Sequence, residues 1–228
     1  MQANALDHVA LWVADRDTLA GFACEHLGMH VIERTEDFTL VGADARRGKL
    51  TLFAAEGPRE RGVLDRVVLR VTDLERAAAA LPGGLDLERP RDDVLLFEGP
   101  EQLGLGLIAS PDAGVEYDID HVVLRVPEPQ RTQAGLAELG LEPDGSRLRV
   151  GDKAVTLEQG PAADGERPLL NHIALLVDSG QEQLDEARRR GLDVTEVRDA
   201  PNTFAVFVWG PDRIKLEYVE HKPTFSLV

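Results

Sequence analysis

The sequence predicts an α+β fold made of four βαβββ modules, and two observations carry this prediction. One strand-like octapeptide occurs four times, starting at Leu6, Leu64, Ile119 and Leu170, and successive copies are 51 to 58 residues apart when measured between their third residues. Such a fixed interval is typical of a repeated structural unit. The segments between the copies combine one helical pattern with several short apolar runs, so each unit has the same order of elements.

The first module shows this order most plainly. Its opening strand is predicted at residues 6–13, and helical spacing of apolar residues follows over residues 16–27, up to Gly28. Short apolar runs separated by polar turn residues then predict three more strands, at residues 27–31, 39–42 and 49–53.

The other modules repeat this order. Helices are predicted at residues 74–81, 131–139 and 181–190. Later strands of the third module are expected at 147–150 and 154–158, joined by a hairpin turn, and those of the fourth at 194–197, 203–209 and 214–219.

Turn-forming residues at 109–114 make the least structured connection between modules, and we place a domain boundary there. Consecutive modules are therefore expected to pair. An N-terminal pair covers residues 1–112, with modules at about 5–57 and 63–109, and a C-terminal pair covers residues 113–228, with modules at about 117–160 and 168–222.

Composition limits the partners of this chain. Its 228 residues carry a formal net charge of -16, which disfavours binding to nucleic acid or to an anionic membrane surface. The single cysteine, Cys24, cannot form an internal disulfide, and the first residues resemble no secretory signal. We expect a cytoplasmic protein, monomeric or homodimeric, whose partner is a small-molecule substrate.

Histidine and glutamate recur at matching positions of the modules. The third residue of the octapeptide is histidine at His8, His121 and His172, but arginine at Arg66. Counted from a turn glycine, the last strands of the third and fourth modules carry a glutamate at the same place, whereas the N-terminal half has Phe53 and Gly106 there. The C-terminal half therefore offers a set of two imidazoles and two carboxylates: His121, Glu158, His172 and Glu217.

Such a set suits one divalent first-row metal ion (Fe, Mn, Ni, Co or Zn) and disfavours calcium or magnesium. The N-terminal pair is expected to be metal-free. His8 has the motif without matched carboxylates in its own half, so it is left out of the predicted site, and His221 is expected to lie beyond reach of it.

Modules that open with Leu/Ile-Asp/Asn-His and close on a strand glutamate resemble the vicinal oxygen chelate superfamily. That superfamily contains glyoxalase I, bleomycin-resistance proteins and extradiol ring-cleaving dioxygenases. The resemblance covers essentially the whole chain. It implies two cupped, partly open mixed β-barrels, each made from two modules, with helices on the outside. It also implies a metal-dependent enzyme that binds a small oxygen-bearing substrate by bidentate chelation in the C-terminal cup.

Three alternatives stay open within this resemblance. The architecture is most like an extradiol dioxygenase, whose ligands would be His121, His172 and Glu217, although residues 198–211 lack the expected acid–base histidine and tyrosine. With Glu158 as fourth ligand the set resembles a glyoxalase-like isomerase or lyase, in which Glu158 or Glu217 would be the catalytic base. The third alternative is a non-catalytic ligand-binding protein of the bleomycin-resistance type.

Two basic residues are candidates for substrate binding. Because side chains alternate along a strand, Arg125 shares a face with His121, and Lys215 shares one with Glu217. Either could bind an anionic group of a substrate. The competing interpretation is that both reach solvent and balance the acidic surface.

Overall fold

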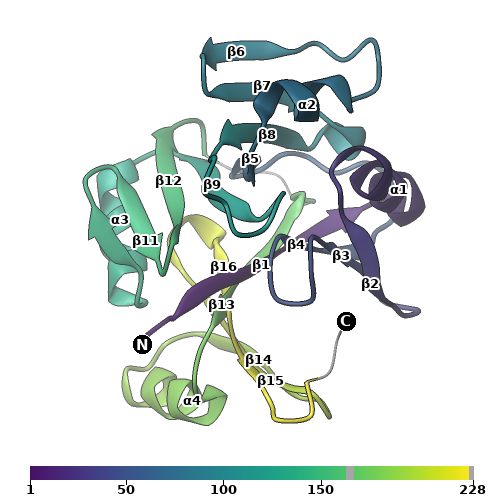
Figure 1. Cartoon of the computed structure of the whole chain (residues 1–228). Coiled ribbons are helices and arrows are strands. Elements are labelled where there is room, and N and C mark those ends of the chain that lie inside the picture. Colours follow the sequence, from purple (N-terminus) through teal and green to yellow (C-terminus); the bar gives the residue numbers. More distant parts are fainter. Residues whose placement is uncertain (163–166, 226–228) are drawn as a thin grey trace.

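The computed structural model describes residues 1–162 and 167–225 and confirms the α+β fold of four βαβββ modules (Figure 1). The first module consists of β1 (Ala5–Val13), α1 (Arg16–His26), β2 (His30–Arg34), β3 (Phe38–Gly42) and β4 (Lys49–Ala54). The second consists of β5 (Leu64–Val71), α2 (Leu74–Ala79), β6 (Glu88–Arg91), β7 (Val94–Glu98) and β8 (Gly104–Ala109).

The C-terminal modules follow the same plan. The third consists of β9 (Ile119–Val126), α3 (Pro129–Glu138), β10 (Glu142–Asp144), β11 (Arg147–Val150) and β12 (Lys153–Gln159). The fourth consists of β13 (Leu170–Leu176), α4 (Gly180–Arg189), β14 (Val194–Asp199), β15 (Thr203–Trp209) and β16 (Lys215–His221). Single-turn 3₁₀ helices at Pro100–Gln102 and Pro211–Arg213 precede the last strands of the second and fourth modules.

The modules do not pair in chain order. Over the described residues, one eight-stranded sheet has the order β14-β15-β16-β13-β1-β4-β3-β2, which joins the first module to the fourth. The other has the order β10-β11-β12-β9-β5-β8-β7-β6 and joins the second module to the third. This arrangement differs from the expected division at residues 1–112 and 113–228. All four opening strands share nearly the same apolar pattern, so the repeat alone does not specify which two become neighbours.

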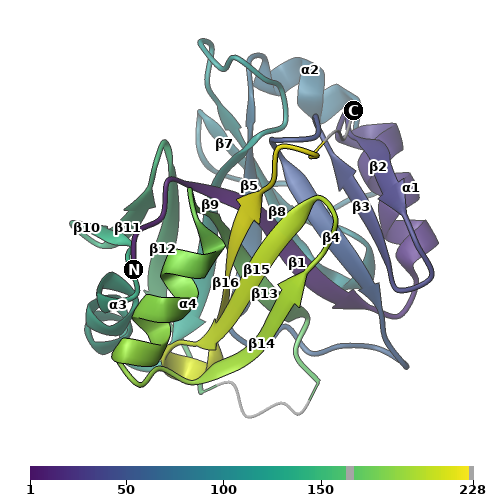
Figure 2. The same cartoon turned by 90° about the horizontal axis from the view of Figure 1, so that it is seen from below.

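Each sheet is mixed in the same way. The two opening strands at its centre run antiparallel, β1 against β13 and β5 against β9, and each is parallel to the last strand of its own module. The first sheet therefore combines the two ends of the chain, and the purple β1 lies beside the green β13 in Figure 1. The helices lie on the outside of the sheets (Figure 2).

Local sequence explains where the helices begin. The side chain of Asp15 accepts hydrogen bonds from the backbone N–H groups of Asp17 and Thr18 at the start of α1, and Asp73 and Ser179 cap α2 and α4 in the same way. No helix within residues 1–162 and 167–225 has the length and apolar character needed to span a bilayer.

Alternation along the strands separates the core from the cup face. In β1, Val9, Leu11 and Val13 are fully buried in a hydrophobic core that both sheets share, while His8 and Trp12 project from the opposite face. This alternation is what places the polar residue of each opening strand inside a cup.

One buried ion pair joins the two sheets. The Lys153 ammonium at the start of β12 lies 2.7 Å from Asp118 and donates to the carbonyl of Leu6, at 3.2 Å, in the other sheet. Asp118 also accepts a hydrogen bond from the backbone N–H of Gly48. The two sheets are thus fixed to one another by hydrogen bonds from this ion pair to the backbone of the first module, as well as by the shared core.

Candidate metal centre

Three potential ligands converge in the cup of the first sheet: His8 on β1, His172 on β13 and Glu217 on β16. One ligand atom from each lies within 4.8 Å of the others, and this is the one such group of three found among residues 1–162 and 167–225. Glu217 Oε2 is 2.8 Å from His172 Nε2 and 3.3 Å from His8 Nε2. All three side chains are largely buried.

The residue before each histidine orients its ring. His8 Nδ1 is 2.8 Å from an Asp7 carboxylate oxygen, and His172 Nδ1 is 3.0 Å from Asn171 Oδ1. When Nδ1–H donates to these oxygens, the lone pair of each Nε2 points to the shared centre beside Glu217. Hydrogen-bonded imidazoles of this kind are typical of histidine ligands to metals, so the donor set fits a divalent ion.

The ionisation of these side chains follows from their crowding. Burial raises the pKa of Glu217, but the charge of His172 and hydrogen bonds from both histidines hold that pKa far below its ordinary range. Burial lowers the pKa of His8, yet hydrogen bonds to Asp7 and Glu217 outweigh it and raise the pKa to about 9. Burial lowers the pKa of His172. Glu217 therefore stays ionised, as a metal ligand requires.

Asp7 is itself held by more than His8. Its carboxylate is 2 % exposed and lies 2.8 Å from Lys49 Nζ and 3.2 Å from His221 Nε2. Burial raises the pKa of Asp7, but Lys49 and the two histidines hold it well below the ordinary value. The carboxylate behind His8 therefore carries its negative charge in the folded protein.

A cavity of about 340 Å³ opens from the three ligands. Its walls are largely apolar, with the rings of Phe38, Phe53, Phe207 and Phe225 among them. The Phe207 ring meets the His172 ring edge-on, with 5.1 Å between centroids. A second cavity of about 430 Å³ shares His172 and Phe207 with the first and is also lined by Trp12 and Lys215.

The structure separates the four residues that the sequence grouped. His172 and Glu217 lie together as expected, but His121 and Glu158 belong to the other sheet. His8 of the N-terminal half, which was not expected at this site, lies beside His172 and Glu217 instead. The antiparallel pairing of β1 with β13 brings His8 there.

Strand register explains the position of Glu158. In β16, Glu217 pairs with Ala174, which lies two residues after His172. The equivalent partner in the third module is Val123, two residues after His121, and it pairs with Thr156 of β12. Glu158 lies two residues further along β12 and pairs with Arg125. Counting from the turn glycine failed because the fourth module inserts a 3₁₀ turn before its last strand and the third has a tight hairpin.

The same comparison identifies a fourth position in the first cup. In β4, the residue that pairs with Ala10, two positions after His8, is Thr51, not Phe53 as the sequence spacing suggested. Thr51 lines the cavity beside the ligands. The pseudo-symmetric set is therefore His8, His172, Glu217 and Thr51, with three strong ligands and one hydroxyl.

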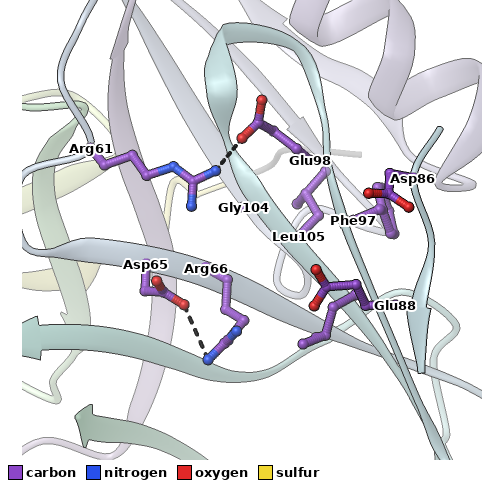
Figure 3. Close-up of a pocket in the computed structure, with 10 residues that line it drawn as sticks. Arg61, Asp65, Arg66, Asp86, Glu88, Phe97, Glu98, Gly104 and Leu105 are labelled. Carbon is purple, nitrogen blue, oxygen red and sulfur yellow. Dashed lines mark hydrogen bonds and ion pairs between the residues drawn. The ribbon is translucent and has the colours of Figure 1, made fainter. Parts of the chain in front are cut away.

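The second cup has a different chemistry. Arg66 occupies the place of His8, and its guanidinium lies 3.0 Å from Glu158 and 3.1 Å from Asp65. Both Arg66 and Asp65 line a pocket of about 360 Å³. Figure 3 shows the two side chains facing one another. His121 keeps the orienting contact, with Nδ1 2.6 Å from Asp120, but a guanidinium cannot bind a metal. Modules one and two, which were expected to form a metal-free N-terminal pair, lie in different sheets instead.

The predicted substrate-binding residues also separate. Lys215 lines the cavity on one side of His172, with its ammonium 5.3 Å from the centroid of the Trp209 ring. Arg125 lies on β9 in the other sheet, where it is half exposed and 4.0 Å from Asp65. Only Lys215 remains near the candidate centre.

Several cavity residues had no signal in the sequence. Phe53 reaches the cavity from β4 of the first module, whereas Phe207 and His221 reach it from β15 and β16 of the fourth. Only the pairing of β1 with β13 brings these strands into one sheet. The one usable signal was the Asp-His dipeptide at Asp7 and His8, which repeats the motif of the third module.

Comparisons with known proteins identify the family of the chain. The family model of the Glyoxalase/Bleomycin resistance protein/Dioxygenase superfamily matches residues 5–218, and the chain belongs to that superfamily. No curated protein sequence matches the chain significantly.

Solved structures share the fold across almost the entire chain. A putative dioxygenase from Bacillus subtilis matches with a TM-score of 0.79 and 19 % identity, covering 98 % of this chain and 87 % of the other. Glyoxalase I from Zea mays matches with a TM-score of 0.75 and 16 % identity, covering 95 % and 92 %. The cppA protein from Streptococcus pneumoniae matches with a TM-score of 0.68 and 14 % identity, covering 96 % and 100 %. At these identities the likeness concerns the fold alone.

Proposed function

We propose that this protein is a metal-dependent enzyme that binds a small substrate through two adjacent oxygen atoms, with dioxygenase-type rather than glyoxalase-type ligation. The observation that carries the proposal is the ligand set His8, His172 and Glu217 with Thr51 in the fourth position. Two imidazoles and one carboxylate are typical of non-haem Fe(II) oxygenases. The glyoxalase-like alternative requires four strong protein ligands, and the neutral hydroxyl of Thr51 is a weak ligand in the fourth position.

The residues of the cup have distinct tasks under this proposal. His8, His172 and Glu217 would hold the ion, and Asp7 and Asn171 would keep the two imidazoles in the binding tautomer. A divalent ion there would supply Lewis acidity and open coordination positions for substrate and dioxygen.

Cavity shape limits the substrate. The phenyl rings of Phe38, Phe53 and Phe207 favour a small, flat and mostly apolar molecule with its oxygen atoms at one edge. Lys215 lines the adjoining cavity, which shares His172 and Phe207 with the first one, and is the candidate partner for an anionic substituent.

Metal content tests the proposal directly. Protein purified without chelator, or loaded anaerobically with Fe(II), is expected to hold about one metal ion per chain by plasma mass spectrometry. Glu217→Gln should lose it, while the matched variant Glu158→Gln, in the other sheet, should retain it. Wild-type protein that binds no metal under either condition would refute the proposal. Oxygen uptake by the Fe(II)-loaded protein with a panel of catechols then tests the oxygenase assignment, and its absence with every catechol would argue against it.

A further inference from the structure

His221 lies on the wall of the cavity that the three candidate ligands open into. It follows Glu217 by four residues on β16, so both side chains project from the same face of the strand. Its side chain is 13 % exposed. The expectation that His221 lies beyond reach of the cup is therefore wrong.

Asp7 orients the His221 ring. His221 Nε2 lies 3.2 Å from Asp7 Oδ1, and the other oxygen of that carboxylate lies 2.8 Å from His8 Nδ1. With Nε2–H donating to Asp7, the lone pair of His221 resides on Nδ1. Among the residues that the structure describes, Nδ1 of His221 has no hydrogen-bond partner.

The ring is also fixed by stacking. The Phe225 ring lies parallel to the His221 ring, with 3.8 Å between centroids and 4° between planes. The Lys49 ammonium lies 5.7 Å from the centroid of the Phe225 ring and 2.8 Å from Asp7. An imidazole held by a carboxylate on one side and an aromatic face on another has the geometry of a positioned base.

Other ionisable groups of the cavity are already engaged. His8, His172 and Glu217 form the candidate metal centre, Lys49 is paired with Asp7, and the guanidinium of Arg198 is paired with Glu196. Glu33, on β2, is the remaining described carboxyl group that lines the cavity. His221 and Glu33 are therefore the two groups that could exchange a proton with a bound molecule.

We propose that His221, oriented by Asp7, is the acid–base residue that takes a proton from a chelating substrate in this cavity. The step breaks one O–H bond of the substrate and forms an N–H bond at His221 Nδ1, while the electron pair stays on the substrate oxygen. Asp7 balances the imidazolium charge. This inference rests on the proposed function, because the metal centre places the substrate oxygens.

Proton counting tests the assignment without requiring turnover. Wild-type and His221→Gln proteins are loaded with Co(II), which does not consume dioxygen as Fe(II) can, and titrated calorimetrically with catechol near neutral pH in two buffers of different ionisation enthalpy. Since His221 retains one substrate proton in the wild type, His221→Gln should release about one more proton to the buffer per catechol bound. Acetohydroxamic acid, a second bidentate probe, should give the same difference.

Two variants provide the comparison. His26→Gln removes an imidazole outside the cavity, on α1, and should release as many protons as the wild type. Glu33→Gln removes the competing carboxyl group and should also match the wild type.

Each other outcome counts against the proposal. Equal proton release from wild type and His221→Gln, or extra release from Glu33→Gln instead, would overturn it. Loss of cobalt from His221→Gln would show that the residue only supports Asp7. Failure of both probes to bind the cobalt-loaded wild type would overturn the assignment of this cavity. Wild-type protein that takes up no cobalt would instead refute the proposed function itself.

Discussion

The Nε2 atoms of His8 and His172 lie 3.3 Å apart, although 164 positions separate the two residues in the chain. Each imidazole comes from the opening strand of a different module, and the antiparallel pairing of β1 with β13 brings the two rings together edge-on, with 5.4 Å between their centroids. The candidate centre therefore depends on contact between the first and last modules. Neither half of the chain contains it alone.

Replacing His8 and His121 separately by alanine tests which of them shares a metal ion with His172. We expect His8→Ala to lower metal affinity by more than about 100-fold, because loss of a direct ligand exceeds the effect of losing an outer hydrogen bond. His121→Ala should leave the affinity unchanged, since His121 lies in the other sheet. Competition with a chromogenic chelator measures both. Loss of affinity in His121→Ala alone would instead favour the set drawn from the C-terminal half.

Asn171 offers a test of ring orientation. Asn171→Leu removes the oxygen that accepts from His172 Nδ1, and we expect metal affinity to fall by about 10- to 100-fold as the ring loses its fixed tautomer. Asn171→Asp restores an acceptor and should recover the affinity. If Asn171→Asp binds metal as weakly as Asn171→Leu, Asn171 has only a packing role.

Buried charge between the sheets should matter for stability. Lys153→Met leaves Asp118 charged and buried without its cation, and we expect the free energy of unfolding to fall by about 3 to 5 kcal/mol. Arg149→Met breaks an exposed pair with Glu142 and should cost less than about 1 kcal/mol. Urea denaturation measures both, and similar losses in the two variants would contradict the expectation.

Acid should weaken the second cup through Asp120. Burial raises the pKa of Asp120, but hydrogen bonds from His121 and Arg70 outweigh it and lower the pKa from 3.8 to about 2. Because the pKa is lower in the folded protein, the ionised carboxylate stabilises the fold at any pH above the ordinary pKa of an aspartate. This contribution disappears as the pH falls from about 4 towards 2. We therefore expect the wild type to lose about 2 kcal/mol more than Asp120→Asn over that interval. Parallel loss of stability in the two proteins, followed by urea denaturation at each pH, would contradict this.

Sequence alone predicts the modules well because their information is local. The octapeptides, the helical spacing after them and the turn glycines each depend on neighbouring residues, and the structure contains all four helices within about two residues of the predicted bounds. The sequence grouped His172 with Glu217 for the same reason, since both belong to one module, and the two side chains lie 2.8 Å apart.

The pairing of modules is not local. The apolar residues of β1, β5, β9 and β13 are interchangeable, so the repeat did not indicate that His8 would meet His172. Glu158 was misplaced by a smaller effect. A two-residue difference in turn length moves it from the position of Glu217 to a contact with Arg66, and turn length cannot be read from the distance to a glycine.

Thr51 provides a test of how the cup sets its ligand number. Thr51→Glu places a second carboxylate beside Glu217, so without metal we expect a lower melting temperature than wild type, because two like charges share a buried site. A divalent ion would bind both carboxylates, and the rise in melting temperature on adding Co(II) should then exceed that of the wild type. Thermal unfolding of both proteins with and without Co(II) measures these two rises in melting temperature. The matched variant Thr156→Glu, at the equivalent position of the second cup, has Arg66 and His121 as neighbours in place of His8 and His172. It should show no metal-dependent rise beyond that of the wild type. An equal rise in both variants would mean that added carboxylate, rather than the geometry around His8 and His172, determines metal binding.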